Sequence, residues 1–287
     1  MEFKNYTTAD YEALCGFLIA LNRDDKRHIN WNWARLEWMY EHPAFDKSTK
    51  DAIGLWLDGG RIVGAAIYDM YFGEAFCGAL SGYEELYPAI LSYAYRELGD
   101  ESGLGVSVCD DSAAEIEALT ALGFTLSEQD ETVMSLSLDE ELAADLPRGF
   151  AIEELDPERQ AYDFQWLLWQ GFDHGTDRAE FEVKDPIVPQ IRRHFDRRLS
   201  LTAVSPEGEK AAYCCLWYDE RTDYAYVEPV CTVPAYRGRG IARALIREAL
   251  NRARALGAQR AYVISDAPFY EKIGFEKAYH FSFYWKE

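Results

Sequence analysis

Residues 227–257 read VEPVCTVPAYRGRGIARALIREALNRARALG and fall into three parts. Residues 227–233 are apolar and rich in β-branched side chains, which predicts a strand. Pro229 has no N–H to donate, so it is expected at a bulge or an open edge of that strand. Two glycines and two arginines alternate in the turn that follows. Apolar residues then recur at helical spacing over 241–256, and a glycine ends the run.

The turn between the strand and the helix has the composition of an anion-binding loop. Gly238 and Gly240 can adopt positive φ angles, which turn successive backbone N–H groups toward one point. The helix that follows adds unpaired N–H donors and the positive end of its dipole. No Lys-Ser/Thr pair follows the glycines and a third glycine is missing, so neither a Walker loop nor a GxGxxG dinucleotide loop fits.

Two motifs together resemble those of the GNAT superfamily of N-acetyltransferases. Residues 237–242, RGRGIA, match the R/Q-x-x-G-x-G/A pattern of that family's acyl-CoA loop. Residues 269–275, FYEKIGF, look like its F/L-Y-x-x-x-G-F segment, and a predicted strand at 261–265 lies between the two motifs. The resemblance implies an α/β (α+β) fold whose mixed, mostly antiparallel sheet is flanked by helices.

The resemblance also implies acyl-CoA, most simply acetyl-CoA, as the cofactor. The end of the strand would hold the pantetheine arm and the turn would hold the phosphates. A backbone N–H near Val233 would polarise the thioester carbonyl. The residues expected to bind the cofactor are Cys231, Thr232, Val233, Arg237, Gly238, Arg239, Gly240, Ile241, Ala242 and Arg243.

Acyl transfer to an amine also needs an acid for the departing thiolate and a base for the amine. Tyr270 matches the family's general acid by position, since a phenol is protonated at neutral pH. Glu228, the one carboxylate of its strand, is either the base or an ordinary surface glutamate. Asp173, His174 and Asp177 are the other candidates for the base.

The order of predicted elements occurs twice, which indicates two tandem GNAT-like domains, 1–146 and 147–287. Where the second copy has its arginine–glycine turn, residues 81–85 of the first read SGYEE. One glycine and two carboxylates cannot cradle a pyrophosphate. The first domain is therefore predicted to lack the acyl-CoA loop, and the second to be the catalytic one.

Periodicity and end signals place the remaining elements. Helices are expected at 8–21, 84–98, 111–122, 158–172 and 191–198, and the last strands of the two copies at 132–138 and 279–285. Ser112 and Glu115 have the spacing of a capping box for the helix after residue 111. A segment dense in aromatics either lines a ligand groove or forms core; it contains Trp31, Trp33, Trp38 and Tyr40.

Composition limits the cellular context. The chain has 287 residues and a net charge of −21. Residues 1–145 hold 28 acidic against 9 basic residues (−19), and residues 146–287 hold 22 against 20 (−2). This acidity argues against nucleic acid and anionic membrane as partners, and it serves either solubility or attraction of cations.

No apolar run suits a membrane span and the N-terminus does not resemble a signal peptide, so a cytoplasmic location is expected. The six cysteines lie mostly in apolar runs without a CxxC pair, which favours buried thiols over disulfides or zinc. The histidines show no metal-ligand spacing, and no metal is expected.

The sequence thus predicts a GNAT-type N-acyltransferase that moves an acetyl group from acetyl-CoA to an amine held between the two halves. A small polycationic amine would suit the acidic half. The alternatives are an acyl-CoA-binding sensor without turnover and a mycothiol-synthase-like acetyltransferase. The sequence leaves the acceptor and the oligomeric state open.

Overall fold

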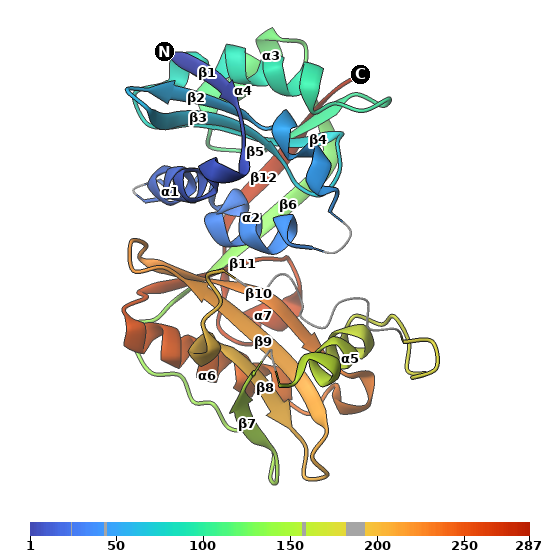
Figure 1. The fold of residues 1–287 in the computed structure, drawn as a ribbon. Coiled ribbons are helices and arrows are strands. Elements are labelled where there is room, and N and C mark those ends of the chain that lie inside the picture. The colour runs from blue at the N-terminus through green and yellow to red at the C-terminus, as the bar shows by residue number, and fades with distance from the viewer. Residues whose placement is uncertain (24, 43–44, 157–158, 182–192) are drawn as a thin grey trace. The chain divides into compact units, whose positions relative to one another are not determined.

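The computed structural model describes residues 1–287 except 24, 43–44, 157–158 and 182–192 (Figure 1). The chain divides into two compact units. Unit 1 comprises Met1–Met134, Ile264–Asp266 and Lys277–Glu287, and unit 2 comprises Ser135–Val263 and Ala267–Glu276. Each unit has a mixed, mostly antiparallel sheet flanked by helices, as predicted.

Seven strands form the sheet of unit 1, in the order β1-β2-β3-β4-β5-β12-β6. They are β1 (Glu2–Asn5), β2 (Gly54–Asp58), β3 (Arg61–Tyr68), β4 (Glu74–Ala79), β5 (Leu104–Cys109), β12 (Glu276–Lys286) and β6 (Thr125–Ser137). β2 and β3 form an antiparallel hairpin, and β4 runs parallel to β5. The last residues of β6, from Ser135 on, belong to unit 2.

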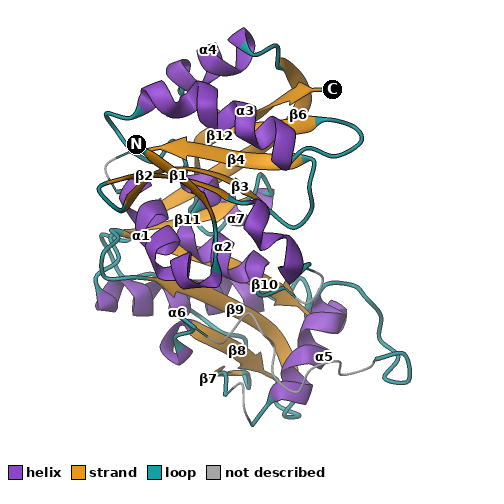
Figure 2. Cartoon of the chain, turned by 45° about the horizontal axis from the view of Figure 1, so that its top comes forward, coloured by secondary structure: helices purple, strands orange, loops and turns teal. Residues whose placement is uncertain are grey.

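Helices cover both faces of this sheet. Figures 1 and 2 show α1 (Tyr11–Leu21) and α2 (Trp33–Tyr40) on one side of β2 and β3, and α3 (Tyr87–Glu97) on the other. A further helix, α4 (Ala113–Ala121), follows β5. Because both faces are covered, β3 is buried from Ile62 to Tyr68 instead of alternating. The four aromatic residues at 31–40 are at most 8% exposed, so they belong to the core.

The last strand of the chain is the main departure from the predicted domains. We expected residues 279–285 to complete the second copy, and the boundary to fall at 146/147. Instead β12 pairs with β5 from Phe281 opposite Cys109 to Lys286 opposite Leu104, within unit 1. Phe281 and Phe283 are buried there. Alternating apolar residues predict a strand with one buried face, but they do not specify which sheet receives it.

Unit 2 carries the strands β11-β10-β9-β8-β7 in this order. Their bounds are β7 (Ala151–Glu154), β8 (Ser200–Val204), β9 (Lys210–Tyr218), β10 (Tyr224–Thr232) and β11 (Arg260–Ile264). Its helices are α5 (Ala161–Gly171), α6 (Ile241–Leu256) and α7 (Pro268–Glu271). Part of the helix predicted at 191–198 lies outside the described residues. A short 3-10 helix at Arg197–Leu199 is what the remainder contains, so a helix over 193–198 was wrong.

The α6 helix follows the prediction closely. Its apolar stripe from Ile241 to Ala253 is buried, and it packs on β8, β9 and β10. Gly257 ends it with φ = 115°, and the next residue returns its N–H to the Ala253 carbonyl. β9 is buried from Ala211 to Trp217 because both α5 and α6 pack on it.

All six cysteines are free and buried, as predicted. Among the helices that the structure describes, none combines the length and the apolar character needed to cross a bilayer.

Candidate functional site

The arginine–glycine turn has the backbone geometry of an anion site. Gly238 and Gly240 have φ angles of 76° and 78°, the left-handed region that favours glycine. Gly240 is the N-cap of α6 and supplies no side chain to cap the helix. The first N–H groups of α6 therefore remain available to a ligand at its positive end.

Strand β10 has a bulge in its pairing with β9 and stops pairing with β11 near the same point. Its pairing with β9 shifts register between Val227 and Val230, so Pro229 lies at a bulge, as predicted. Its parallel pairing with β11 covers Tyr224 to Tyr226 and goes no further. Beyond that point, none of the described strands pairs with the edge of β10 that faced β11.

The proposed donor near Val233 needs correction. The Val233 N–H donates to the Ala211 carbonyl at 3.0 Å, so it faces β9 and is already used. Backbone groups of an antiparallel strand alternate in direction. The N–H groups of Val230 and Thr232 therefore point to the open edge, and these two are the better candidates for polarising a carbonyl.

One pocket of about 800 Å³ brings most of the predicted site residues together. Of the predicted residues, the following line it: Cys231, Thr232, Arg237, Gly238, Arg239, Gly240, Ile241, Ala242, Arg243 and Tyr270. Val233 and Glu228 do not line it. Two motifs separated by some thirty residues of sequence thus meet in one cavity of unit 2.

The three arginines of the turn and helix differ in their bonding. Arg237 donates to the carbonyls of Thr232 (2.9 Å) and Gly171 (3.0 Å) and to the Asp173 carboxylate (2.9 Å). Arg239 donates to the Ala235 carbonyl and lies over the Tyr236 ring. Within the described part of the chain, Arg243 has no hydrogen-bond or ion-pair partner. Arg237 thus ties the turn to the end of α5, and Arg243 is the cation left for a ligand.

Tyr270 lies in the short helix α7, where its ring meets Phe269 and Phe275 edge-on. Burial raises the pKa of its phenol, and the neighbouring Cys214 and Glu228 raise it further. The hydroxyl is therefore fully protonated at neutral pH. A protonated phenol on the pocket wall can donate a proton to a leaving group.

The candidates for the base are dispersed. Glu228 is partly exposed, and its backbone carbonyl accepts from the Trp217 indole at 2.7 Å. The Glu228 carboxylate is close enough to raise the Tyr270 pKa. Asp173 is paired with Arg237, and the Asp177 carboxylate accepts from the Ala179 N–H.

The remaining candidate for the base is His174. Its ring lies tilted by 39° against the Trp169 ring, with the ring centroids 5.2 Å apart. None of the three alternatives to Glu228 lines the pocket.

The cysteines near the pocket are poor nucleophiles. Burial raises the pKa of the Cys231 thiol to about 12, and it raises that of Cys214 well above its ordinary value. A thiol has to ionise before it can attack an acyl group. The site therefore favours direct transfer to an acceptor over an acylated cysteine.

Six further residues line the pocket although the sequence analysis did not assign them to the site: Gly171, Val230, Tyr236, Phe269, Lys272 and Ile273. Lys272 follows Tyr270 by two residues and adds a cation to the wall. Phe269 is 37% exposed, which is high for a large apolar ring. The sequence feature that could have identified Gly171 is its position as a glycine at the end of a helix rich in aromatic residues.

Gly171 fits because it lacks a side chain. A Cβ added there would lie 2.5 Å from the Cys231 sulfur and 2.7 Å from its Cβ. We expect Gly171→Ala to lower the free energy of unfolding by about 1–3 kcal/mol, since the close packing of α5 on β10 leaves no room. Thermal unfolding measures this.

Gly16→Ala is the matched control for Gly171→Ala. It lies within α1, where an added Cβ meets no atom within 4 Å. This change should be neutral or stabilise by up to about 1 kcal/mol. Equal destabilisation by both substitutions would contradict the packing argument.

The corresponding turn of unit 1 is blocked by its own side chain. Gly82 again has a positive φ, 88°, but its N–H donates to both oxygens of the Glu84 carboxylate, at 3.1 and 3.0 Å. An internal carboxylate thus takes the place that a phosphate would need. In the described residues of the chain, no group of three or more His, Cys, Asp or Glu side chains could hold a metal ion.

Residues 160–275 match the family described as "Acetyltransferase (GNAT) family". This part of the chain is a GNAT acetyltransferase domain, as its two motifs and its pocket indicate. The curated relatives include the uncharacterized N-acetyltransferase YhbS of Escherichia coli K12, 27% identical over 105 residues. That alignment covers 35% of this chain and 63% of YhbS, so the chain spans less than two thirds of that relative's length.

Solved structures extend the likeness to the whole fold. A GCN5-related N-acetyltransferase from Sphaerobacter thermophilus aligns over 100% of this chain and 95% of its own, with a TM-score of 0.61 and 16% identity. A tandem GNAT protein from the clavulanic acid biosynthesis pathway aligns over 100% and 98%, with a TM-score of 0.64 and 17% identity. At these identities the likeness concerns the fold alone.

Proposed function

We propose that this protein is an acetyl-CoA-dependent N-acetyltransferase whose reaction takes place in unit 2. The observation that supports this most directly is the composition of the 800 Å³ pocket. An anion-binding turn, an arginine without a partner among the described residues, an open strand edge and a protonated tyrosine line it together. A site for phosphate alone would not need the last two.

The residues present fit acetyl-CoA. The N–H groups of Gly238 and Gly240 and the side chains of Arg239, Arg243 and Lys272 would hold its phosphates. The open edge of β10 would accept the pantetheine amides in the manner of an added strand. When bound, acetyl-CoA supplies a thioester carbonyl that an amine can attack.

The residues of the chain then perform three tasks. The N–H groups of Val230 and Thr232 polarise the carbonyl, and their positions are fixed before the substrate arrives. Glu228, directly or through a water molecule, takes the proton that the amine must lose. Tyr270 gives its proton to the sulfur as the C–S bond breaks. The products are an amide and free coenzyme A. Glu228 has gained the proton that the amine lost and Tyr270 has lost the proton that the sulfur gained, so there is no net change in protons for a neutral amine.

The acceptor in this proposal is a small molecule with one or more amino groups. Because burial keeps Cys231 and Cys214 protonated, the amine attacks the thioester directly. The charge of −19 in residues 1–145 favours acceptors with several positive charges.

Turnover of acetyl-CoA against a panel of amines, followed as free thiol, tests the proposal. The panel contains spermidine, an aminoglycoside, glucosamine and an amino acid. Amine-dependent thiol release by the intact protein supports an N-acetyltransferase. If acetyl-CoA binds with ordinary affinity and no amine of a broad panel releases thiol, the protein is an acyl-CoA sensor and the proposed activity is wrong.

Salt dependence tests the role of the acidic half. At saturating acetyl-CoA, kcat/KM for a polycationic amine should fall steeply between low and physiological ionic strength, because attraction at a distance is screened. Spermidine and a monoamine are compared, and the slope should be larger for spermidine. A kcat/KM that does not change with salt for either amine would leave solubility as the role of that charge.

A further inference from the structure

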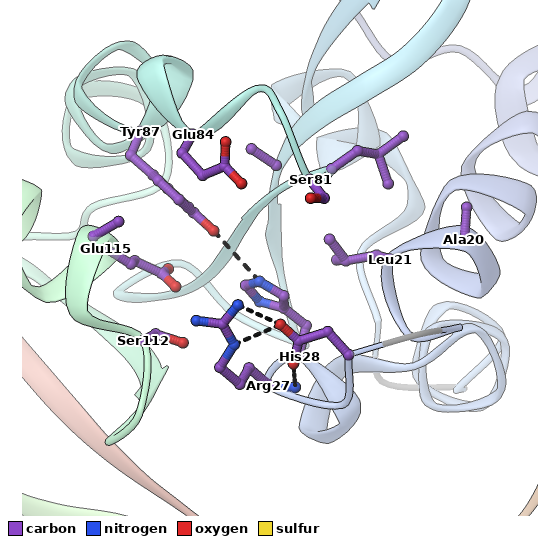
Figure 3. A pocket seen from close by; sticks show the side chains of 13 residues that line it. Ala20, Leu21, Arg27, His28, Ser81, Glu84, Tyr87, Ser112 and Glu115 are labelled. Carbon is purple, nitrogen blue, oxygen red and sulfur yellow. Dashed lines mark hydrogen bonds and ion pairs between the residues drawn. The ribbon is translucent and has the colours of Figure 1, made fainter.

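Unit 1 contains its own cavity, of about 230 Å³, at the ends of β4, α3 and α4 (Figure 3). It lies at the position that corresponds, in the repeated order of elements, to the acyl-CoA pocket of unit 2. In both units a strand end, a glycine turn and the start of the next helix form the wall. The two cavities differ in the charge of their lining side chains. Arginines line the unit 2 pocket, whereas Asp25, Glu84 and Glu115 line this one.

Glu115 is the buried polar side chain of this cavity that lacks a hydrogen-bond partner among the described residues. It is 1% exposed, and within that part of the chain neither carboxyl oxygen accepts a hydrogen bond. The capping box predicted for Ser112 and Glu115 is absent: Ser112 gives its N–H to the Cys109 carbonyl at 2.8 Å, and its side chain makes no cap bond. Figure 3 shows the Glu115 carboxyl directed into the cavity, toward Arg27 and Tyr87.

The groups around Glu115 are occupied with one another. Arg27 pairs with Asp25 through its Nε and a terminal nitrogen. The Tyr87 hydroxyl and His28 Nε2 are 3.4 Å apart. Glu84 accepts from the Gly82 N–H, as described above. The cavity therefore holds an unsatisfied acceptor and more carboxylates than cations.

We propose that this cavity binds a small molecule through a primary ammonium group that donates to Glu115. An ammonium has three N–H donors and a positive charge, so it would satisfy both carboxyl oxygens and compensate their burial. Phosphates and carboxylates are disfavoured because three acidic side chains line the cavity against one guanidinium. Its volume suits a short aliphatic amine. The proposal does not depend on acyl transfer, since no residue is shared with the unit 2 pocket.

The protonation state of Glu115 gives the proposal a distinctive signature. Burial raises the pKa of its carboxyl well above the ordinary value of 4.5, and Arg27 opposes this shift. Burial also lowers the pKa of His28 to about 4, so this ring is neutral at pH 7. The other titratable groups facing Glu115 are Asp25, Cys77, Glu84 and Tyr87. Binding of an ammonium should therefore release a proton from Glu115.

Titration calorimetry on the intact protein with n-butylamine tests this, and n-butanol is the neutral comparison. The amine should bind saturably and at least tenfold more tightly than the alcohol. Glu115→Gln keeps the shape of the side chain and should weaken the amine at least tenfold. Glu117→Gln, an exposed position on the same helix, should leave it unchanged. Titrations in buffers of different ionisation enthalpy should show proton release that Glu115→Gln abolishes.

Three results would overturn the proposal. One is the absence of saturable n-butylamine binding, which would leave water as the only occupant of the cavity. Another is equal binding of n-butanol and n-butylamine, and this comparison needs no variant to fold. The third is unchanged amine affinity in Glu115→Gln, which would place any bound amine elsewhere, for instance at the acceptor site of unit 2.

Discussion

Tyr270→Phe should lower kcat for acetyl transfer by about 10²–10⁴-fold, the usual contribution of a positioned acid. The substitution removes one hydroxyl and keeps the ring that packs against Phe269 and Phe275. Fold and acetyl-CoA affinity should therefore hold. The loss should be similar for every amine, because the thiolate that needs the proton is the same in each case. Steady-state kinetics with two or more amines measures this.

Two comparisons make the Tyr270 prediction sharper. Tyr162→Phe, an exposed tyrosine of α5, should leave kcat unchanged. Glu228→Gln should give a defect that shrinks at high pH, where more of the amine is already deprotonated. Near-normal kcat in Tyr270→Phe would assign that residue to packing, and a Glu228→Gln defect that is constant with pH would move the base to Asp173 or His174.

The local parts of the fold could be predicted because short-range physics decides them. The run from Ile241 to Gly257 carries its own apolar stripe and its own glycine stop, and α6 spans Ile241–Leu256. Pro229 lies at a bulge because a residue without an N–H cannot continue the ladder. The two motifs of the GNAT domain meet in one pocket since both flank the opening between β10 and β11.

The predictions that were wrong depend on contacts with residues outside the local sequence. The strand at the C-terminus was predicted as a strand, but its sheet depends on which edge offers a partner, and β5 of unit 1 does so. Val233 was chosen without knowing the register, and a shift of one residue reverses the direction of an N–H. Ser112 and Glu115 have the spacing of a capping box, yet Cys109 competes for the backbone N–H and wins. In each case a competing partner, invisible in the local sequence, decided the outcome.

The bonding of the arginines revises which of them should matter most for the cofactor. Arg237 matches the first position of the family motif, but its guanidinium already holds Thr232, Gly171 and Asp173. Its replacement would loosen the turn as well as remove a charge, so a loss of binding there has two explanations. Arg243 lines the same pocket with no partner in the described residues, which makes it the cleaner position to test.

Arg243→Glu should weaken acetyl-CoA binding by about 100-fold or more, because a charge-assisted bond to phosphate is replaced by repulsion between like charges. Arg243 lies in the first turn of α6, where the helix dipole disfavours a cation and favours an acid. The variant without ligand should therefore be as stable as the parent protein or slightly more stable. Calorimetric titration with acetyl-CoA and thermal unfolding without it measure the two effects separately.

Glu84→Ala is the control from unit 1. It frees the Gly82 N–H but adds no cation, so acetyl-CoA affinity and a stoichiometry of one per chain should persist. Tighter binding or a second bound acetyl-CoA in that variant would show that the carboxylate alone blocks unit 1.

Weaker binding in Arg243→Glu accompanied by a lower unfolding temperature would mean that Arg243 supports the helix. Weaker binding at unchanged or raised stability has one physical reading, which is that the first turn of α6 keeps an unfavourable cation because a phosphate binds there.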